Sequence, residues 1–533
     1  MEAPSSHWEE FYLGSRQFQC IADTLGMPID QVNFILGQLM ALFLAYLFRV
    51  QAHPTKVSDT TRHWGSLVAG LGISYFCFGK QVVLALVLVI GCYILMITLP
   101  ITLIHHVTLI SSITFLSVMH IQRQLYEDGV FVIDVTGPMM IMVQKATALA
   151  YSLHDGLSGL KDEELTPLQR ELVLRKKPSA LQYFSYMINF HSVLAGPFFM
   201  FADYQDFIEG THYAKRALNH TVPKDSLDSN RNENPEDAKV TKRILKPEEE
   251  PDPTNVSLSK AGFSFVCAFV TVAILPKFPI SHLTEPYFFK SSFLYKTMYI
   301  VAVTSLTRHV YYTGWILADS ICNMSGMGFN GYDNHGAAKW DLVSNVNVLG
   351  IEFGSNLRES LEAWNSGTMK WLRFMVYERA PFQKTLFTYM LSSLWHGFYP
   401  GYYLTFIGGA FFTVVARTVR RSVRPHILSR GPKVKFAYDI VTSVATRLNL
   451  AYLTFPFVLL RFWGTIEVLK SLYFYQTVIG ILVIAVLPKI LSPPRNTGKL
   501  KPSKVQSEAS ASQVEAEKIG DSQPPEIDHM KVH

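Results

Sequence analysis

Charged side chains are scarce in this sequence. Asp, Glu, Lys and Arg make up 17% of its 533 residues, against ~25% in an ordinary soluble protein. A third of these charges, 30 of 90, lie in the two segments 211–260 and 493–533, so the rest of the chain is poorer still. Because 49% of the residues are hydrophobic, the composition excludes a generally disordered chain and is typical of a polytopic membrane protein.

Cysteine is also rare, and no two cysteines form a CxxC pair. The five lie far apart in the chain, which excludes a secreted protein held together by disulfides: Cys20, Cys77, Cys92, Cys267 and Cys322. The net charge of +6 is small for this length. Lys and Arg in loops that face the cytoplasm account for it, so we expect no nucleic-acid partner.

Long apolar runs organise the rest of the chain. Lys80 and Arg123 are separated by 42 residues without one charge, about twice the ~20 residues that a single span needs, with Pro100 near the middle. We therefore expect two helices there. Similar segments elsewhere predict an all-α polytopic protein with about ten or eleven transmembrane helices, plus re-entrant or interfacial helices, around a central chamber.

Composition also divides the chain into regions. The sequence predicts an N-terminal segment (1–32), a first group of membrane helices (33–210), a charged, disordered loop (211–260), a second group of helices (261–492) and a disordered tail (493–533). The arginine-rich stretch 417–435 should face the cytoplasm. The side of the 211–260 loop stays open, because its nine basic residues favour the cytoplasm whereas sequons at Asn219 and Asn255 favour the lumen.

His396 is the most informative residue. It lies in a 32-residue stretch, 385–416, without Asp, Glu, Lys or Arg, and an ionisable side chain at membrane depth indicates function. Imidazole accepts a proton near neutral pH. Gly397, Pro400 and Gly401 break the helix after it, and irregular backbone in a membrane must face protein or a water-filled cavity. We expect His396 to line a chamber; the alternative is a hydrogen-bonded core histidine.

Four other histidines lie in apolar segments, and for these a structural role is the better prediction: His105, His106, His120 and His191. The first two are adjacent in sequence and cannot share a helix face. No carboxylate lies near them at the spacing of metal ligands, so we expect no metal site.

Asn365 is the second candidate, since a side-chain amide both donates and accepts hydrogen bonds. It lies 31 positions before His396, about 46 Å away if both were on one helix. Pro381 lies almost midway between them, so a hairpin that turns there has nearly equal arms and returns both side chains to a similar depth. The alternative is that Asn365 caps a helix, which is the more common use of asparagine.

Aromatic and basic residues alternate between Asn365 and Lys384. Such a band suits the membrane interface and can attract a phosphate-bearing ligand from the cytoplasm, with simple interfacial anchoring as the alternative. The residues that we predict to bind substrate lie in this band or beside the two candidates above: Trp364, Trp371, Arg373, Tyr377, Arg379 and Trp395.

These motifs together resemble a known family. The pair Trp364-Asn365 and the block Leu394-Trp-His-Gly-Phe-Tyr-Pro-Gly-Tyr-Tyr403 are similar to those of the membrane-bound O-acyltransferase family, in particular its lysophospholipid acyltransferase branch. Further similar blocks follow in order along the chain and begin at Pro28, Gly137, His154, Val193, Trp340 and Tyr377.

The resemblance implies an enzyme of the endoplasmic reticulum membrane that acts in phospholipid remodelling. Its acyl donor would be acyl-CoA as co-substrate, without a further cofactor, and its acceptor lysophosphatidylethanolamine, lysophosphatidylserine or lysophosphatidylcholine. The resemblance implies His396 as general base and Asn365 as the residue that positions the thioester and its oxyanion. The segment 304–324 departs from the family pattern, so the head group is not fixed. Two alternatives remain: a protein O-acyltransferase of the same family, and a transporter with His396 as a proton relay.

Overall fold

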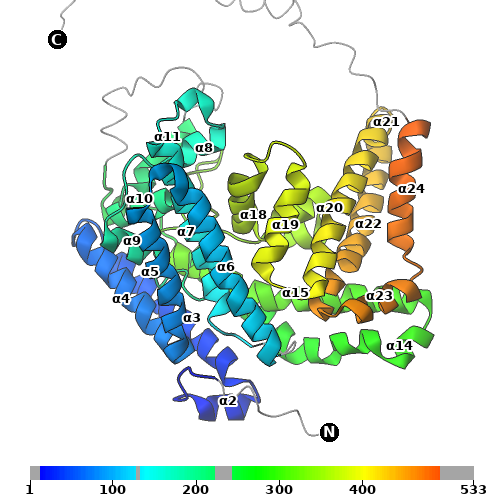
Figure 1. The fold of residues 1–533 in the computed structure, drawn as a ribbon, viewed down its shortest axis with the longest axis horizontal. Coiled ribbons are helices and arrows are strands. Elements are labelled where there is room, and N and C mark those ends of the chain that lie inside the picture. Colours follow the sequence, from blue (N-terminus) through cyan, green and yellow to red (C-terminus); the bar gives the residue numbers. More distant parts are fainter. Residues whose placement is uncertain (1–11, 128–131, 222–242, 492–533) are drawn as a thin grey trace, which may run out of the picture.

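The computed structural model describes residues 12–127, 132–221 and 243–491. Their regular structure is helical: this part of the chain contains no β-strand, only an isolated antiparallel bridge between Tyr332 and Ala338. The all-α prediction is therefore confirmed. Two groups of long helices stand side by side, and a shorter helical hairpin lies between them (Figure 1).

The first group comprises α3 (Ile29–Val50), α4 (Asp59–Phe78), α5 (Val82–Thr98), α6 (Ile101–Glu127) and α7 (Thr136–Leu157). In this group α3 packs on α4, α5 on α6, and α7 on both α5 and α6. The two helices expected between Lys80 and Arg123 are α5 and α6, and the break between them falls at Leu99 and Pro100. Proline ends the helix because it removes a backbone donor and restricts the residue before it.

The second group comprises α15 (Phe293–Met324), α20 (Pro400–Ser422), α22 (Pro432–Leu459) and α24 (Tyr475–Ile490). Here α20 contacts both α22 and α24, while α15 crosses against α22 and carries α13 (Thr254–Phe269) along its side. The two groups are joined through α15, which also packs on α3. One polar contact marks this junction, where the Gln38 amide donates to the Gly314 carbonyl at 3.2 Å.

Shorter helices complete the fold: α2 (Gln19–Leu25), α8 (Pro167–Leu172), α9 (Ala180–Met187), α10 (Phe201–Glu209), α11 (His212–Thr221), α14 (Pro286–Lys290), α16 (Val348–Phe353), α17 (Leu357–Ala363), α18 (Ser366–Leu372), α19 (Lys384–His396), α21 (Arg424–Leu428) and α23 (Phe462–Ser471). The ordered structure extends into both ends of the 211–260 segment, since α11 and the start of α13 lie in it. Tyr213 is buried there and Arg216 forms an ion pair with Asp203. Residues 222–242 and the tail from 492 lie outside the described residues.

Within the described residues, five segments are long and apolar enough to cross a membrane: Ile29–Val50, Asp59–Thr98, Ile101–Leu125, Thr254–Thr284 and Pro400–Leu428. The pair α23 and α24, bent by 75°, adds a sixth if it counts as one span. The chain is thus a multi-pass membrane protein, but by this measure it has fewer spans than the ten or eleven expected.

The long helices α7 and α15 are not among these segments because they carry polar side chains that the interior satisfies. On α7, the buried Lys145 ammonium donates to the Tyr186 carbonyl at 3.0 Å and to Ser192 Oγ at 2.7 Å. On α15, Asp319 accepts from Lys260 at 2.7 Å. A buried charge needs such partners. Polar side chains of this kind lower the hydropathy of a helix even when the protein encloses it, so hydropathy alone does not identify such a helix as part of the membrane bundle.

Two glycines of α4 test the helix packing. A Cβ atom at Gly70 would lie 1.7 Å from the Ile188 carbonyl oxygen, whereas one at Gly72 would meet nothing within 4 Å. We expect Gly70→Ala to destabilise the detergent-solubilised protein by about 2 kcal/mol or more through overpacking. Gly72→Ala should stabilise it by roughly 0.5 kcal/mol, since alanine favours the helix. Thermal unfolding followed by size-exclusion chromatography measures both, and equal melting temperatures would contradict the packing.

Candidate active site

The helical hairpin places the two candidate residues at the same end. Asn365 directly precedes α18, which continues as a π-helical segment, η8 (Arg373–Tyr377), before the chain turns and returns as α19, ending at His396. Both α18 and η8 contact α19. The hairpin that the position of Pro381 predicted is confirmed, so residues 31 positions apart return to one level of the fold.

A single large cavity, here called the chamber, has a volume of about 2470 Å³ and is lined by both Asn365 and His396. Its walls come from the hairpin, from α15 and α17, from α20, α22 and α24, and from parts of α3, α6 and α7. Four of the predicted substrate-binding residues line it as well: Trp364, Arg373, Tyr377 and Trp395. These six predicted site residues therefore line the same chamber.

His396 is the last residue of its helix and is half-buried against the chamber. Its ring stacks on Phe406 at 5.1 Å between centroids and meets the edge of Phe457 at 5.2 Å. Neither ring nitrogen hydrogen-bonds to a residue in the described part of the chain. The alternative of a hydrogen-bonded core histidine is thus not what the structure shows, and the imidazole is free to accept a proton from a ligand.

The break after His396 needs a glycine. Gly397 has φ +115° and ψ −159°, a backbone region that is essentially restricted to glycine. A Cβ atom at this position would also lie 3.1 Å from Cγ of His120, which is buried and hydrogen-bonded to the Trp395 carbonyl at 3.1 Å. The break therefore fixes the direction in which α19 ends and holds His396 at the chamber wall.

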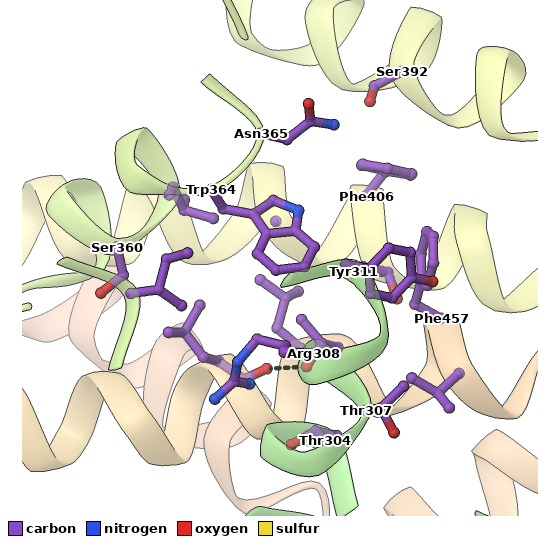
Figure 2. Close-up of a pocket in the computed structure, with 18 of the residues that line it drawn as sticks. Thr304, Thr307, Arg308, Tyr311, Ser360, Trp364, Asn365, Ser392, Phe406 and Phe457 are labelled. Carbon is purple, nitrogen blue, oxygen red and sulfur yellow. Dashed lines mark hydrogen bonds between the residues drawn. The ribbon is translucent and has the colours of Figure 1, made fainter. Parts of the chain in front are cut away.

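Asn365 occupies the N-cap position of α18 but does not cap it. Its side chain makes no capping hydrogen bond, and its backbone is left-handed, with φ 50° and ψ 51°. In Figure 2 its amide points toward Ser392, which lies one helical turn before His396 on α19. The capping alternative is therefore wrong, and the amide is available to a ligand in the chamber.

Hydrogen bonds from the segment before α16 hold Asn365 in this conformation. Ser366 donates its backbone N–H to the Asn345 carbonyl at 2.9 Å and its hydroxyl to the Ser344 carbonyl at 2.6 Å. The Gly367 N–H donates to the Asn345 side chain at 3.1 Å. A left-handed asparagine persists where its surroundings over-determine it, and these three bonds do so.

Ser344 is anchored in turn by an ion pair between the half-buried Lys260 and the buried Asp319. Its hydroxyl donates to Asp319 at 2.6 Å, and Lys260 donates to the same carboxylate at 2.7 Å and to the Trp340 carbonyl at 2.8 Å. Lys260, Asp319 and Ser344 come from α13, α15 and the 340–345 segment, so no local sequence pattern predicts their contact. Only the fold brings the three together.

Two of the predicted substrate-binding residues do not line the chamber. Trp371 is fully buried and its indole N–H donates to Thr147 at 2.9 Å. Arg379 forms a bidentate pair with Asp155, at 3.0 and 2.5 Å. Both side chains attach the hairpin to α7, so we correct the expectation of substrate contact to one of positioning. A basic–aromatic pattern does not tell these two roles apart.

The far end of the chamber is basic. Arg417, Arg420, Arg421 and Arg424 line it, at the end of α20 and the start of α21. Since α20 begins at Pro400, next to the break after His396, Arg420 lies about 30 Å farther along the helix at 1.5 Å per residue. Figure 1 shows α21 at one end of α20, with α15 crossing near the other. The chamber thus extends from a polar centre to a cationic end.

Comparison with known proteins shows the family of the chain. Residues 123–455 match the model of MBOAT, the membrane-bound O-acyltransferase family. The chain is 43% identical to lysophospholipid acyltransferase 6 of Drosophila melanogaster, over 93% of this chain and 66% of that protein. It is 38% identical to membrane-bound glycerophospholipid O-acyltransferase 1 of Mus musculus, over 89% of this chain and 93% of the mouse protein. The Homo sapiens protein of the same name is 37% identical, over 89% and 92%.

These matches identify the class. The chain belongs to the membrane-bound O-acyltransferase family, within the branch whose members are named lysophospholipid or glycerophospholipid acyltransferases. It is an acyltransferase, and the transporter alternative is not retained.

The glycine at the helix break tests the placement of His396. Gly397→Ala should force the backbone out of its present conformation and move His396, and a displacement of about 1 Å lowers turnover roughly 100-fold. Gly336 is the matched control, because it also has positive φ, +80°, but is exposed, and a Cβ atom there would meet nothing within 4 Å. Gly336→Ala should keep the wild-type rate of acyl transfer. Equal rates for both variants would show that the break does not position His396.

Proposed function

We propose that this protein transfers an acyl group from acyl-CoA to the free glycerol hydroxyl of a lysophospholipid in the endoplasmic reticulum membrane, as a step in phospholipid remodelling. One observation carries the proposal: His396 and Asn365, neither hydrogen-bonded through its side chain to another described residue, line one chamber from opposite arms of a hairpin. The names of the relatives support a lysophospholipid as acceptor.

The proposed reaction uses His396 as general base. Its imidazole accepts the proton of the lysophospholipid hydroxyl while the oxygen attacks the thioester carbonyl carbon, an assistance worth about 10²–10⁴-fold in rate. The tetrahedral oxyanion then accepts a hydrogen bond from the Asn365 amide, worth about 10²–10³-fold in a site shielded from water. When the intermediate collapses, the C–S bond breaks, the ester forms, and the thiolate of CoA takes the proton back from His396. No metal or redox step is required.

The basic end of the chamber suits the CoA moiety. Arginine binds phosphate through charge-assisted hydrogen bonds, and four arginines line this end. The pantetheine arm holds the phosphates of CoA away from its sulfur, so phosphates bound at this end leave the thioester to extend along the chamber. Phosphates at the arginines would therefore direct the thioester toward His396, with the acyl chain in the apolar part of the chamber.

Substitution of the two central residues tests the reaction. In membranes expressing the protein, supplied with a panel of lysophospholipids and acyl-CoAs, His396→Ala should lower acyl transfer by about 10³-fold or more. Asn365→Ala should lower it by about 10²–10³-fold. His335→Ala and Asn334→Ala are the controls, because both side chains are exposed on a loop away from the chamber, and both should retain full activity.

Two outcomes would contradict the proposal. Full activity in well-inserted His396→Ala and Asn365→Ala variants would remove the assigned roles. A wild-type protein that consumes no lysophospholipid but acylates a polypeptide would favour the protein O-acyltransferase alternative.

The basic end makes a separate prediction. The double variant Arg420→Gln/Arg424→Gln should raise KM for acyl-CoA by about tenfold or more, since a charge-assisted hydrogen bond contributes about 1.5–3 kcal/mol, and leave KM for the lysophospholipid unchanged. Lys433→Gln/Lys435→Gln removes the same charge from the same surface, but these lysines do not line the chamber. Equal effects of the two double variants would mean that only the overall field attracts CoA.

A further inference from the structure

One face of α15 is polar where it borders the chamber. Thr304, Thr307, Arg308 and Tyr311 follow the spacing of a single helical face and all line the chamber. Figure 2 shows them rising from one helix toward Trp364, with Asn365 on the other side of that ring. The Tyr311 and Trp364 rings are in contact, with centroids 5.6 Å apart. Arg308 is thus the basic residue of this face, and it lies beside the Asn365 end of the chamber.

A carboxylate outside the chamber holds Arg308 from behind. Glu352 accepts from Nε at 2.8 Å and from Nη2 at 2.7 Å, and it also accepts from the Tyr312 hydroxyl at 2.8 Å. Glu352 does not line the chamber, whereas Arg308 does. Glu352 binds two of the three guanidinium nitrogens, Nε and Nη2, and does not bind Nη1. The guanidinium is therefore fixed in orientation and retains a donor for a second acceptor.

The local charge favours an anion. Arg447 on α22 lies close to Glu352, yet it makes no ion pair within the described residues. Its guanidinium donates to the carbonyls of Ile351 and Gly354 and to the Ser360 hydroxyl. Of the two described carboxylates near Arg308 and Arg447, Glu352 is half-buried and bound to Arg308, whereas Glu359 on the neighbouring α17 is exposed. A half-buried excess of positive charge is stabilised by an anion that enters from the chamber.

The acceptor supplies such an anion at the right place. A lysophospholipid carries its phosphodiester on the carbon next to the one that bears the free hydroxyl, so its phosphate must lie close to His396 and Asn365 when the hydroxyl reacts. The phosphates of CoA lie a pantetheine arm away from the reacting carbonyl, and the arginines at the far end of α20 suit them. The position of Arg308, across Trp364 from Asn365, fits the first ligand and not the second.

We propose that Arg308, oriented by Glu352, binds the phosphodiester of the lysophospholipid and so selects phosphate-bearing acceptors. The inference rests on the proposed function and adds to it the residue that recognises the acceptor. It also gives a role to the segment 304–324, in which the sequence departs from the family pattern.

The test neutralises both members of the ion pair, so that neither is left as a buried single charge. Arg308→Gln/Glu352→Gln should raise KM for lysophosphatidylethanolamine at least tenfold and leave KM for oleoyl-CoA within twofold of wild type. The preference for lysophosphatidylethanolamine over 1-oleoylglycerol, which has the glycerol hydroxyl but no phosphate, should fall at least tenfold. The control is Arg175→Gln/Asp162→Asn, an ion pair that is exposed and outside the chamber.

A binding measurement keeps the test valid if turnover is lost. Equilibrium binding of a fluorescent lysophosphatidylethanolamine to the purified, monodisperse double variant should be at least tenfold weaker than to wild type. Unchanged binding, an unchanged preference over 1-oleoylglycerol, or KM values for both substrates rising together would overturn the inference. If wild type itself acylates no lysophospholipid, the proposed function fails, and not the assignment of Arg308 alone.

Discussion

The ion pair between Arg379 and Asp155 fixes the hairpin on which the site depends. Arg379 lies at the turn of the hairpin and Asp155 near the end of α7, and the guanidinium also lies over the rings of Tyr151 and Phe374, 4.8 Å from each centroid. The Asp155 side chain has no solvent exposure, so removal of Arg379 would leave a buried carboxylate with His154, at 3.3 Å, as its remaining partner, at a cost of up to about 3–5 kcal/mol. This contact attaches the turn of the hairpin to α7, and from this turn the two arms run toward Asn365 and His396.

The chamber shows how polar chemistry is accommodated in an apolar helical bundle. The helix break after His396 exposes backbone groups, and the fold satisfies them locally: the Gly401 N–H donates to the Leu460 carbonyl at 2.9 Å. A Cβ atom at Gly401 would lie 2.0 Å from the Pro456 carbonyl oxygen, so this closeness of α20 to α22 requires glycine. Irregular backbone is tolerated here because protein encloses it on one side and the chamber adjoins it on the other. His396 can therefore lie beside this break without disrupting the helices around it.

The hairpin and its two end residues could be predicted from the sequence because each has a local signal. Charge scarcity around His396 marks an ionisable group in an apolar stretch, and the position of Pro381 sets the length of the arms. The supports of the site had no such signal. Asp319 and Ser344 act on Asn365 only through contacts between distant segments, and Trp371 and Arg379 looked like interfacial anchors or ligand contacts although they pack against α7. The number of helices apolar enough to span a membrane is lower than expected for a related reason. Polar side chains on α7 and α15 have partners inside the protein, and the sequence does not show these partners.

The central claim is that one chamber brings a thioester carbon between His396 and Asn365. The most direct measurement is a cryo-electron microscopy structure with a non-hydrolysable thioether analogue of acyl-CoA. We predict that the carbon replacing the thioester carbonyl lies within contact distance of both side chains, with the phosphates at Arg420 and Arg424 and the acyl chain inside the chamber. An analogue bound with its sulfur outside the chamber, or separated from His396 by packed protein, would contradict this claim.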